Sequence, residues 1–482
     1  MHFPRQRTGD PLGTTPLYGE HALVLGASMS GILAARVLAD HFARVTLVER
    51  DRLPTDGRPR RGVPQGRHAH LLLAPGAHAL DELFPGVLAE LVEAGVPVAR
   101  SLDQLHVEIG GHVFCQGTSP ASTGQESRGA LFEPSRPFLE ATLLRRVQDL
   151  GNVDIMDACD VLGLSADYTL TRVTGARVEP NAVGHAPRDV LADLVVAATG
   201  RSGRLTAWLK RMGYPAPVEE EVDVDLTYAS QRFRIPGSRM EPLTLVAVGA
   251  SADWPRGAAA LAQEDGTWIV TLFGYAGHHP PLAFEDWLAF ADTVLPRRIR
   301  RALRVAKPVG EVQQQRFPAN IWRRFDKLHR FPEGLVALGD AVCALNPVYG
   351  QGMTVAALEA LALRDVLRAG SSPVAPRFFE ATARPIGEAW RFAVGGDLQL
   401  PASVVPGARP LRMRAVRSYI DRAHAVAEHD PVMAWRILDA MGFAEPRESL
   451  FTTDSLRRVA MNSRVRRRTE VAAAPHLRQV WP

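Results

Sequence analysis

The chain has 482 residues and a mass of 52.5 kDa, which exceeds the usual size of one hydrophobic core and favours two closely packed domains or one domain with large insertions. Hydrophobic residues make up 46% and charged residues 22%, as in a globular protein rather than a disordered or fibrous one. The net charge of +4 is small, and Lys and Arg are spread along the chain, which argues against a nucleic-acid-binding protein.

The cysteines and the absence of long apolar runs indicate a cytoplasmic protein. Cys115, Cys159 and Cys343 are too widely spaced to suggest a disulfide framework or a metal site, so we expect no metal. Residues 1–20 are polar and contain Pro and Gly, so they are expected to form a flexible leader rather than a signal peptide. No apolar run approaches the roughly 18 residues of a membrane-spanning helix.

The first predicted elements form a strand–helix–strand unit. Residues 21–25 and 44–48 are short apolar runs typical of buried strands, and residues 32–40 between them have helical periodicity. Such a unit implies parallel strands joined by a right-handed crossover, which opens a doubly wound fold. Two further buried strands are predicted at 193–198 and 335–338, each followed by a glycine turn, and they can extend the same sheet.

The pattern changes between these strands and again at the end of the chain. Residues 222–315 contain alternating or aromatic-rich runs separated by turn residues, which predicts an inserted antiparallel sheet. From about Asp397 onward the patterns are helical. The chain then reaches a basic stretch that we interpret as a solvated helix face or tail and that includes Arg464, Arg466, Arg467 and Arg468.

The first strand ends in a turn with the sequence GASMSG, which is similar to a dinucleotide-binding fingerprint. Gly26 permits the tight turn and Gly31 lets helix and strand approach, so the amide groups at the helix start can receive a pyrophosphate. Ser28 replaces the middle glycine of the fingerprint but is also small. Glu49 ends the second strand, where a carboxylate can bind an adenosine ribose. Taken alone, the GASMSG sequence can be an ordinary turn and Glu49 can be an exposed residue at a strand end. The two features together favour nucleotide binding.

A second motif, GDAVCALNPVYGQGM at residues 339–353, follows a buried strand. The strand ends in a Gly-Asp pair, an Asn-Pro pair fixes a turn, and two glycines expose main-chain amides at the head of a helix that begins near Met353. Such amides can stabilise negative charge on a reduced ring system.

With the run RRGVPQGRHAH at residues 60–70, these motifs make about residues 20–390 resemble the class A FAD-dependent monooxygenases, the group of the aromatic hydroxylases and squalene epoxidase. The resemblance is greatest to bacterial polyketide epoxidases such as the lasalocid epoxidase. It implies an α/β fold with a Rossmann-like FAD-binding domain, an inserted antiparallel-sheet substrate domain and a helical C-terminal region. The expected boundaries are 1–20 for the leader, 21–215 and 332–395 for the FAD-binding domain, 216–331 for the substrate domain and 396–482 for the helical region.

The same resemblance implies which residues contact the cofactor. The residues expected to bind FAD are Gly26, Ser28, Gly31, Glu49, Arg61, Gln65, His68, Arg136, Asp340, Pro347, Gly350, Gln351, Gly352 and Met353. Among these, the isoalloxazine ring is expected against the residues from Pro347 to Met353. Substrate contacts are expected from alternating positions of the inserted sheet, although core packing is the commoner role for such residues; the candidates are Tyr228, Arg232, Trp268, Phe273 and Tyr275.

In the family that the chain resembles, NADPH or NADH reduces the flavin, and dioxygen then forms a flavin hydroperoxide that passes one oxygen atom to an alkene or an electron-rich ring. The cofactor supplies the difficult step, so the protein needs neither a nucleophile nor a metal. The resemblance therefore implies a monooxygenase, either an epoxidase or a hydroxylase, that acts on a hydrophobic polyketide-like molecule in natural-product biosynthesis.

Other functions remain open at this point. A flavin-dependent halogenase is disfavoured because the WxWxIP motif of that family is missing. A non-redox cyclase of the decalin-forming [4+2] type would keep every FAD motif, so the sequence leaves it as the alternative. A pure binding or scaffold protein is the third class.

Overall fold

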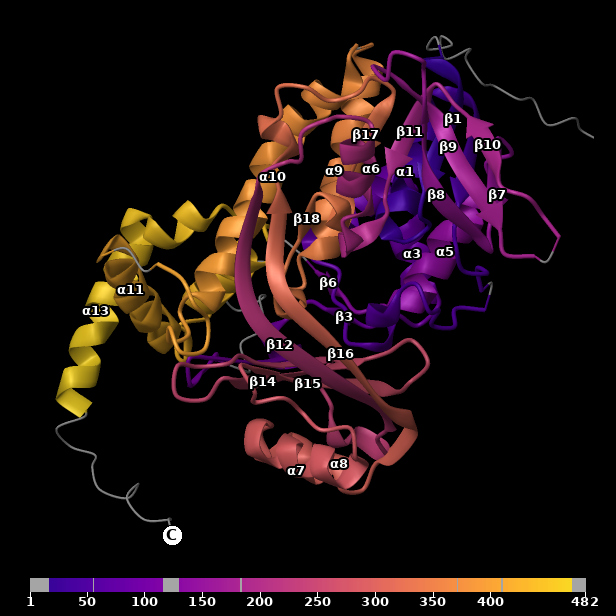
Figure 1. Cartoon of the computed structure of the whole chain (residues 1–482). Coiled ribbons are helices and arrows are strands. Elements are labelled where there is room, and N and C mark those ends of the chain that lie inside the picture. Colours follow the sequence, from indigo (N-terminus) through magenta and orange to yellow (C-terminus); the bar gives the residue numbers. More distant parts are fainter. Residues whose placement is uncertain are drawn as a thin grey trace, which may run out of the picture.

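A computed structural model describes residues 17–54, 56–115, 130–182, 184–370, 372–408 and 411–469 (Figure 1). Most of the expected leader lies outside these ranges, and so do the side chains of the basic stretch at 464–468. Within the described ranges, the model contains no helix that is both long and apolar enough to cross a membrane.

The part of the chain that the sequence predicts to bind FAD contains a five-stranded parallel sheet. In spatial order its strands are β17 (Leu335–Ala337), β11 (Leu194–Ala197), β1 (Gly19–Leu25), β2 (Phe42–Val48) and β7 (Val153–Met156). The last five residues of β1 are buried, which explains their uninterrupted apolar sequence. β1 begins at Gly19, two residues before the strand expected from the sequence.

Helices cover one face of this sheet and a small second sheet covers the other (Figure 1). The helices are α1 (Met29–Ala39), α5 (Arg136–Gln148) and α9 (Gly352–Arg368), with α2 (Ala74–Leu83) and α10 (Val374–Asp397) packed against α9. The second sheet is antiparallel and contains β8 (Cys159–Ala166), β9 (Val173–Pro180) and β10 (Arg188–Leu191). Together with the five-stranded sheet, these layers confirm the predicted α/β fold class.

The inserted sheet has eight strands and is larger than the sequence predicts. Its order is β18 (Cys343–Ala344), β16 (Lys307–Arg323), β12 (Glu219–Arg234), β15 (Trp268–Tyr275), β14 (Arg256–Ala262), β13 (Leu245–Val248), β4 (Leu105–Ile109) and β5 (His112–Val113). β4, β5 and β18 come from outside residues 216–331. β4 joins β13 in parallel, so a segment expected in the FAD-binding domain extends the inserted sheet.

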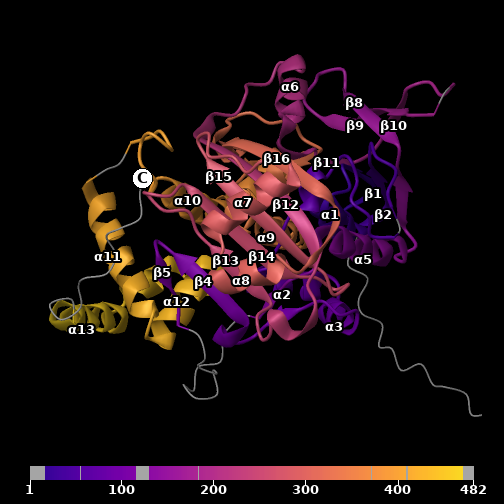
Figure 2. The same ribbon diagram turned by 90° about the horizontal axis from the view of Figure 1, so that it is seen from below.

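The two longest strands, β12 and β16, run from the FAD-binding part into the inserted sheet, as Figure 1 shows. Their pairing contains two register shifts, which bend the ribbon. The outer face of the sheet is covered by α7 (Phe284–Val294) and α8 (Arg297–Leu303) (Figure 2). The inner face is thereby directed toward the FAD-binding part.

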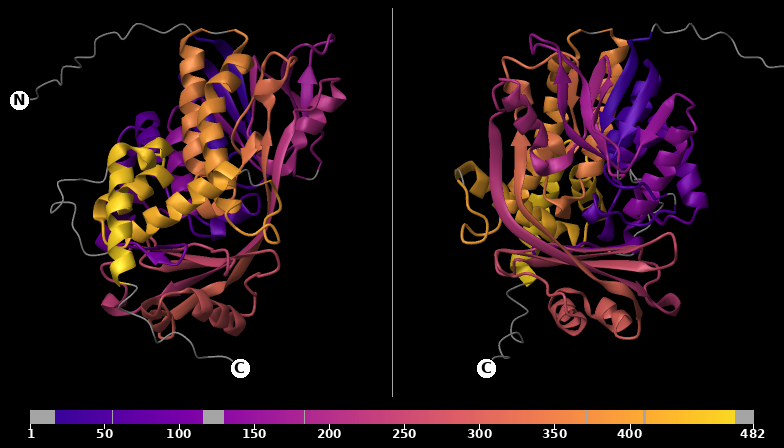
Figure 3. Two further views of the ribbon diagram at one scale, coloured as in Figure 1. Left: turned by 90° about the vertical axis from the view of Figure 1, so that its left-hand side faces the viewer. Right: turned by 45° about the vertical axis from the view of Figure 1, so that its right-hand side comes forward.

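The C-terminal region is helical, as expected. α11 (Leu411–Ala427), α12 (Pro431–Met441) and α13 (Thr453–Thr469) form a group beside the inserted sheet (Figure 3). Their buried side chains share an apolar core with residues of β4 and β13, including Leu105 and Leu245. This packing places the three helices at the edge of the inserted sheet.

Candidate functional site

A cavity of about 1180 Å³ lies between the parallel sheet and the inserted sheet. Its lining combines the β1–α1 turn, the segment around 60–71, the loop 347–353, the inner face of the inserted sheet, and residues of α10, α11 and α12. Single small-molecule pockets measure about 300–1,000 Å³, so this cavity has room for a cofactor together with a substrate.

Two glycines shape the nucleotide end of the cavity. Gly26 has a φ of +107°, and a Cβ there would lie 2.4 Å from the carbonyl oxygen of Ala198 in the neighbouring chain segment. A Cβ on Gly31 would lie 1.7 Å from the carbonyl oxygen of Gly26. Gly26 lines the cavity, whereas Gly31 does not and instead permits the contact between α1 and the turn.

Ser28 and Arg136 meet at the head of α1. Arg136 Nη2 donates to Ser28 Oγ at 2.9 Å, and Ser28 Oγ donates to Glu140 Oε1 at the same distance. Ser28 occupies the N-cap position but its side chain does not cap the helix, so the first amide groups of α1 receive no side-chain acceptor from it. A helix start with an adjacent arginine is suited to a phosphate group.

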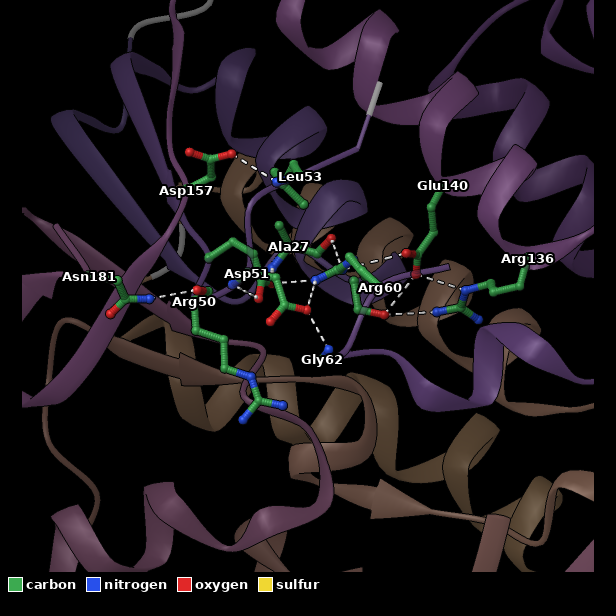
Figure 4. Close-up of polar contacts among 12 residues, drawn as sticks. Ala27, Arg50, Asp51, Leu53, Arg60, Gly62, Arg136, Glu140, Asp157 and Asn181 are labelled. Carbon is green, nitrogen blue, oxygen red and sulfur yellow. Dashed lines mark hydrogen bonds and ion pairs between the residues drawn. The ribbon is translucent and has the colours of Figure 1, made fainter. Parts of the chain in front are cut away.

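Glu49 belongs to a buried charge cluster around Arg60. Glu49 Oε2 accepts the Ala27 amide at 2.8 Å and pairs with Arg60 Nη1 at 3.0 Å. Arg60 also lies 3.5 Å from Glu140 and 3.8 Å from Asp51, and Figure 4 shows it between these groups. Burial acts to raise the pKa of Glu140, but Arg136 and Arg60 hold it below its ordinary value. Glu140 therefore stays ionised and fixes both arginines.

The neighbouring arginine, expected at the cofactor, points elsewhere. Arg61 is exposed and does not line the cavity, while Arg60, which has no predicted role, is 9% exposed and lines it. Adjacent residues in an irregular loop have no fixed periodicity, so the sequence holds no signal for choosing between them.

Gln65 and His68, which the sequence predicts to contact the cofactor, both line the cavity. His68 Nδ1 lies 2.8 Å from Ser230 Oγ, and its ring meets Tyr228 edge-on at 4.5 Å. Burial, followed by the charges of His70 and Arg67, lowers the pKa of His68 to about 3. His68 is therefore neutral at pH 7 and links the 60–71 segment to the inserted sheet.

The second motif places its loop at the head of α9. Pro347, Gly350, Gln351, Gly352 and Met353 all line the cavity, and α9 begins at Gly352. The side-chain amide of Gln351 is 1% exposed, and neither its nitrogen nor its oxygen has a hydrogen-bond partner within the described ranges. A buried amide without a partner, on a loop that lines a cavity, fits a ligand that supplies the missing hydrogen bonds.

Asp340 lines the same cavity beside this loop. Burial raises the pKa of its carboxyl group, against the opposing effect of Arg136, Arg201 and Arg323. Behind it, Glu359 Oε2 accepts the Gly339 amide at 2.8 Å, and burial raises the pKa of Glu359 to about 8. Glu359 is thus neutral at pH 7, and of these two acidic residues only Asp340 faces the cavity.

A buried carboxylate joins the loop to the inserted sheet. Asp397 is fully buried at the end of α10, and its Oδ1 accepts from Asn346 at 2.8 Å, Tyr349 at 3.0 Å and Tyr275 at 3.3 Å. Its Oδ2 accepts from Asn320 at 2.7 Å. Burial raises the pKa of Asp397 to about 6, although these four donors oppose the shift. The network fixes the loop against the sheet.

The five candidate substrate residues divide into two groups. Tyr228, Phe273 and Tyr275 line the cavity. Arg232 instead contacts Asp265 and Thr267, outside the cavity lining. Trp268 packs in the core between the sheet and α7 and α8. Successive side chains of a strand point to opposite faces of its sheet. In β15, residues 268, 270 and 272 face the core under α7 and α8, so Trp268 points away from the face that carries Phe273 and Tyr275.

Much of the remaining wall comes from segments in which the sequence shows no sign of a site. β4 contributes Leu105 and Val107, and α11 and α12 contribute Ile420 and Leu438 among others. The helical patterns of α11 and α12 predict that each buries one face, but they do not say against which element. No local signal therefore identifies these residues.

The comparisons with known proteins agree with this geometry. No protein-family model matches the chain. Protein Rv3254 of Mycobacterium tuberculosis is 41% identical over 426 residues, covering 86% of this chain and 88% of that protein. The kynurenine 3-monooxygenase of Salinispora arenicola is 28% identical over 384 residues, covering 76% of each.

Two solved structures share the fold. The p-nitrophenol 4-monooxygenase PnpA from Pseudomonas putida superposes with a TM-score of 0.63 at 17% identity, covering 89% of this chain and 99% of that one. The flavin-dependent brominase Bmp2 gives 0.64 at 14% identity, covering 93% and 100%. The chain therefore has the fold of flavin-dependent monooxygenases, and a kynurenine 3-monooxygenase is among its relatives. It belongs to the same family as Protein Rv3254.

Proposed function

We propose that the chain is an FAD-dependent monooxygenase that consumes NADPH or NADH and dioxygen and adds one oxygen atom to a hydrophobic, polyketide-like molecule, as an epoxidase or a hydroxylase in natural-product biosynthesis. The observation that carries the proposal is that one cavity is lined both by the loop 347–353 and by an apolar wall of the inserted sheet. That wall consists of Leu245, Val246, Ala247, Val248, Ala258, Ala259, Leu261 and Phe273.

The residues at the nucleotide end fit FAD. The start of α1 with Arg136 would hold the pyrophosphate, and Glu49 would hold the adenosine ribose. Asp340 would lie near the ribityl chain, and Gln351 would give its free amide to the ring system. When bound there, FAD supplies the redox and oxygen-activating chemistry.

The chain's own residues would orient the substrate and limit access of water. The apolar wall binds the carbon skeleton and leaves little for water to hydrogen-bond. Tyr275 and Tyr349 face the cavity from the Asp397 network, and burial together with Asp397 raises their pKa values well above the ordinary one. Both hydroxyls therefore keep their protons and remain hydrogen-bond donors at pH 7.

The experiment that tests this proposal uses purified enzyme, a panel of polyene and aromatic polyketides, and isotopically labelled dioxygen. We expect one substrate to accelerate NADPH oxidation and to yield a product that gains one labelled oxygen atom. A cyclase would instead work without electron flow, by holding two ends of one chain in a reactive geometry. Full activity under anaerobic conditions, with oxidised flavin and a product of unchanged mass, would overturn the monooxygenase proposal in favour of the cyclase.

A further inference from the structure

The last turns of α10 form part of the cavity wall next to the loop 347–353. Phe392, Gly395 and Gly396 line the cavity at a spacing of 3 and 4 residues from the first, so they share one face of α10. Gln399 lines the cavity from the turn that follows the helix. A Cβ on Gly396 would lie 2.3 Å from the hydroxyl oxygen of Tyr349, whereas a Cβ on Gly395 would meet no atom within 4 Å. Tyr349 therefore occupies the space beside Gly396, whereas the space beside Gly395 is free.

Arg447 lies beside this wall. It is half-buried in the short 3-10 segment Arg447–Phe451 that follows α12, and it lines the cavity. Its guanidinium carbon is 5.9 Å from the centre of the Phe392 ring, and that ring contacts Tyr349 with 5.6 Å between centroids. The Phe392 ring thus contacts both the guanidinium group and Tyr349 of the loop.

The charge of Arg447 has no carboxylate partner within the described ranges. Its Nη1 donates to the carbonyl oxygen of Arg391 at 3.4 Å, and none of the ion pairs of this region includes it. Burial lowers the pKa of Arg447, and the neighbouring charges are Glu448, which opposes this effect, and Arg391, which reinforces it. A cation that is partly removed from water and unpaired is stabilised by an incoming anion.

Five acidic residues line the cavity: Glu49, Glu108, Asp253, Asp340 and Asp421. None of the five forms a described ion pair with Arg447, and none contributes to the shift of its pKa. The guanidinium group is therefore left available to a molecule that enters the cavity.

We propose that Arg447 recognises an anionic group of the substrate, so that the cavity takes an apolar molecule that carries a carboxylate. This inference rests on the proposed function, because it names the class of molecule that the same cavity receives. The planar guanidinium group can donate two parallel hydrogen bonds to a carboxylate. Phe392, Leu438 and Met441 line the cavity from α10 and α12 and would contact the carbon chain. Arg447 is thus a specificity-determining residue.

The test uses the FAD-loaded, oxidised enzyme and two probes of equal chain length, dodecanoate and dodecanamide, titrated by calorimetry at pH 7.5. We expect the wild type to bind dodecanoate at least about tenfold more tightly than dodecanamide, as a charged hydrogen-bonded pair allows. In Arg447→Gln this preference should disappear while the affinity for dodecanamide stays within about twofold. Arg447→Lys should retain part of the preference, because a point charge replaces the planar group.

Two control variants locate the effect. Arg391→Gln removes the same charge from an exposed side chain that does not line the cavity, and it should keep the preference for dodecanoate. Gly395→Leu places a side chain into the open part of the wall, and it should weaken the binding of both probes. Flavin absorbance of each variant shows that the protein is folded and loaded.

The proposal is overturned if Arg447→Gln keeps the tenfold preference, if Arg391→Gln loses as much of it, or if the wild type binds neither probe. The assay contains neither NADPH nor a reaction that consumes dioxygen. Failure of the carboxylate preference therefore leaves the monooxygenase proposal standing, and a failure of oxygen transfer leaves the binding result standing.

Discussion

Replacing Asp397 with asparagine should change how the stability of the protein depends on pH. Asp397 is fully buried and accepts four hydrogen bonds, but all four donors are neutral amides or hydroxyls. It is also the last residue of α10, where the helix dipole disfavours a negative charge. The carboxylate is therefore satisfied by hydrogen bonds but uncompensated in charge, which is why its pKa is raised to about 6.

The size of the effect of Asp397 on stability follows from its two pKa values. The difference between a pKa of about 6 in the folded protein and the ordinary value of 3.8 corresponds to about 3 kcal/mol. Below pH 3.8 the group is protonated in both the folded and the unfolded chain, so ionisation does not affect stability there. As the pH rises toward 6, the unfolded chain releases the proton first, so the contribution of Asp397 to the free energy of unfolding falls by up to about 3 kcal/mol. Asparagine does not ionise, so the free energy of unfolding of the Asp397→Asn variant does not fall for this reason as the pH rises.

At low pH the Asp397→Asn variant should be the less stable protein. The protonated carboxyl of the wild type directs one O–H at these four donors, whereas the asparagine amide directs two N–H groups at them in either orientation, because both oxygens of Asp397 accept hydrogen bonds. An unsatisfied buried donor costs about 1–3 kcal/mol. For pH 4 we therefore expect Asp397→Asn to be destabilised by that amount, and for pH 7 we expect it to be as stable as the wild type or up to about 2 kcal/mol more stable.

Urea denaturation of both proteins in excess FAD, followed by circular dichroism between pH 4 and pH 7.5, measures this difference. Asp223→Asn makes the same substitution at an exposed strand position and serves as the control for the change from carboxyl to amide. The reasoning would be refuted if the destabilisation of Asp397→Asn grew as the pH rises, because that result requires an Asp397 carboxyl whose pKa is lowered by folding.

Three further substitutions test other parts of the site. Arg60→Met should cost about 3–5 kcal/mol in urea denaturation because it leaves Glu49 and Glu140 without their shared buried cation, whereas Arg61→Met, at the exposed neighbour, should stay within about 0.5 kcal/mol of the wild type. Asp340→Ala should weaken FAD binding by about 1–3 kcal/mol in a fluorescence titration, and an unchanged dissociation constant would remove Asp340 from the cofactor site. Gly396→Ala should destabilise the protein by about 1–3 kcal/mol in urea denaturation through its clash with Tyr349, while Gly395→Ala should be tolerated.

The elements that could be predicted from the sequence are those whose signal is local. The parallel strands are short buried runs, and the turns after them need glycine for reasons of backbone geometry, as at Gly26 and Gly31. The second motif likewise combines a strand end, a turn and a helix start within residues 339–353. Each of these features is decided by residues that are near neighbours in the chain.

The features that could not be predicted depend on contacts between distant segments. β4 joins the inserted sheet by pairing with β13, about 140 residues later in the chain. The sequence of a short strand does not identify the strand with which it pairs. The sequence does not distinguish Arg60 from its neighbour Arg61. Arg60 is the buried one because it pairs with Glu49 and Glu140, which are distant in the chain. The sequence gives no sign that Asp397 is buried and accepts four hydrogen bonds, because its donors come from elements far apart in the chain.

The two ends of the cavity differ in how freely their residues can be exchanged. The end at which we propose that FAD binds is built from main-chain amides, glycines and a fixed set of charges, whose geometry leaves little freedom for substitution. The other end is built from side chains of β13, α10, α12 and the segment after α12, where an apolar residue can be exchanged without breaking a hydrogen bond. Because the chemistry resides in the cofactor, a change of substrate requires changes only at the second end. Substitutions at Phe392 or Leu438 should therefore alter which molecule binds while FAD affinity stays the same, and a parallel loss of both would show that the two ends are coupled through Tyr349 and the loop.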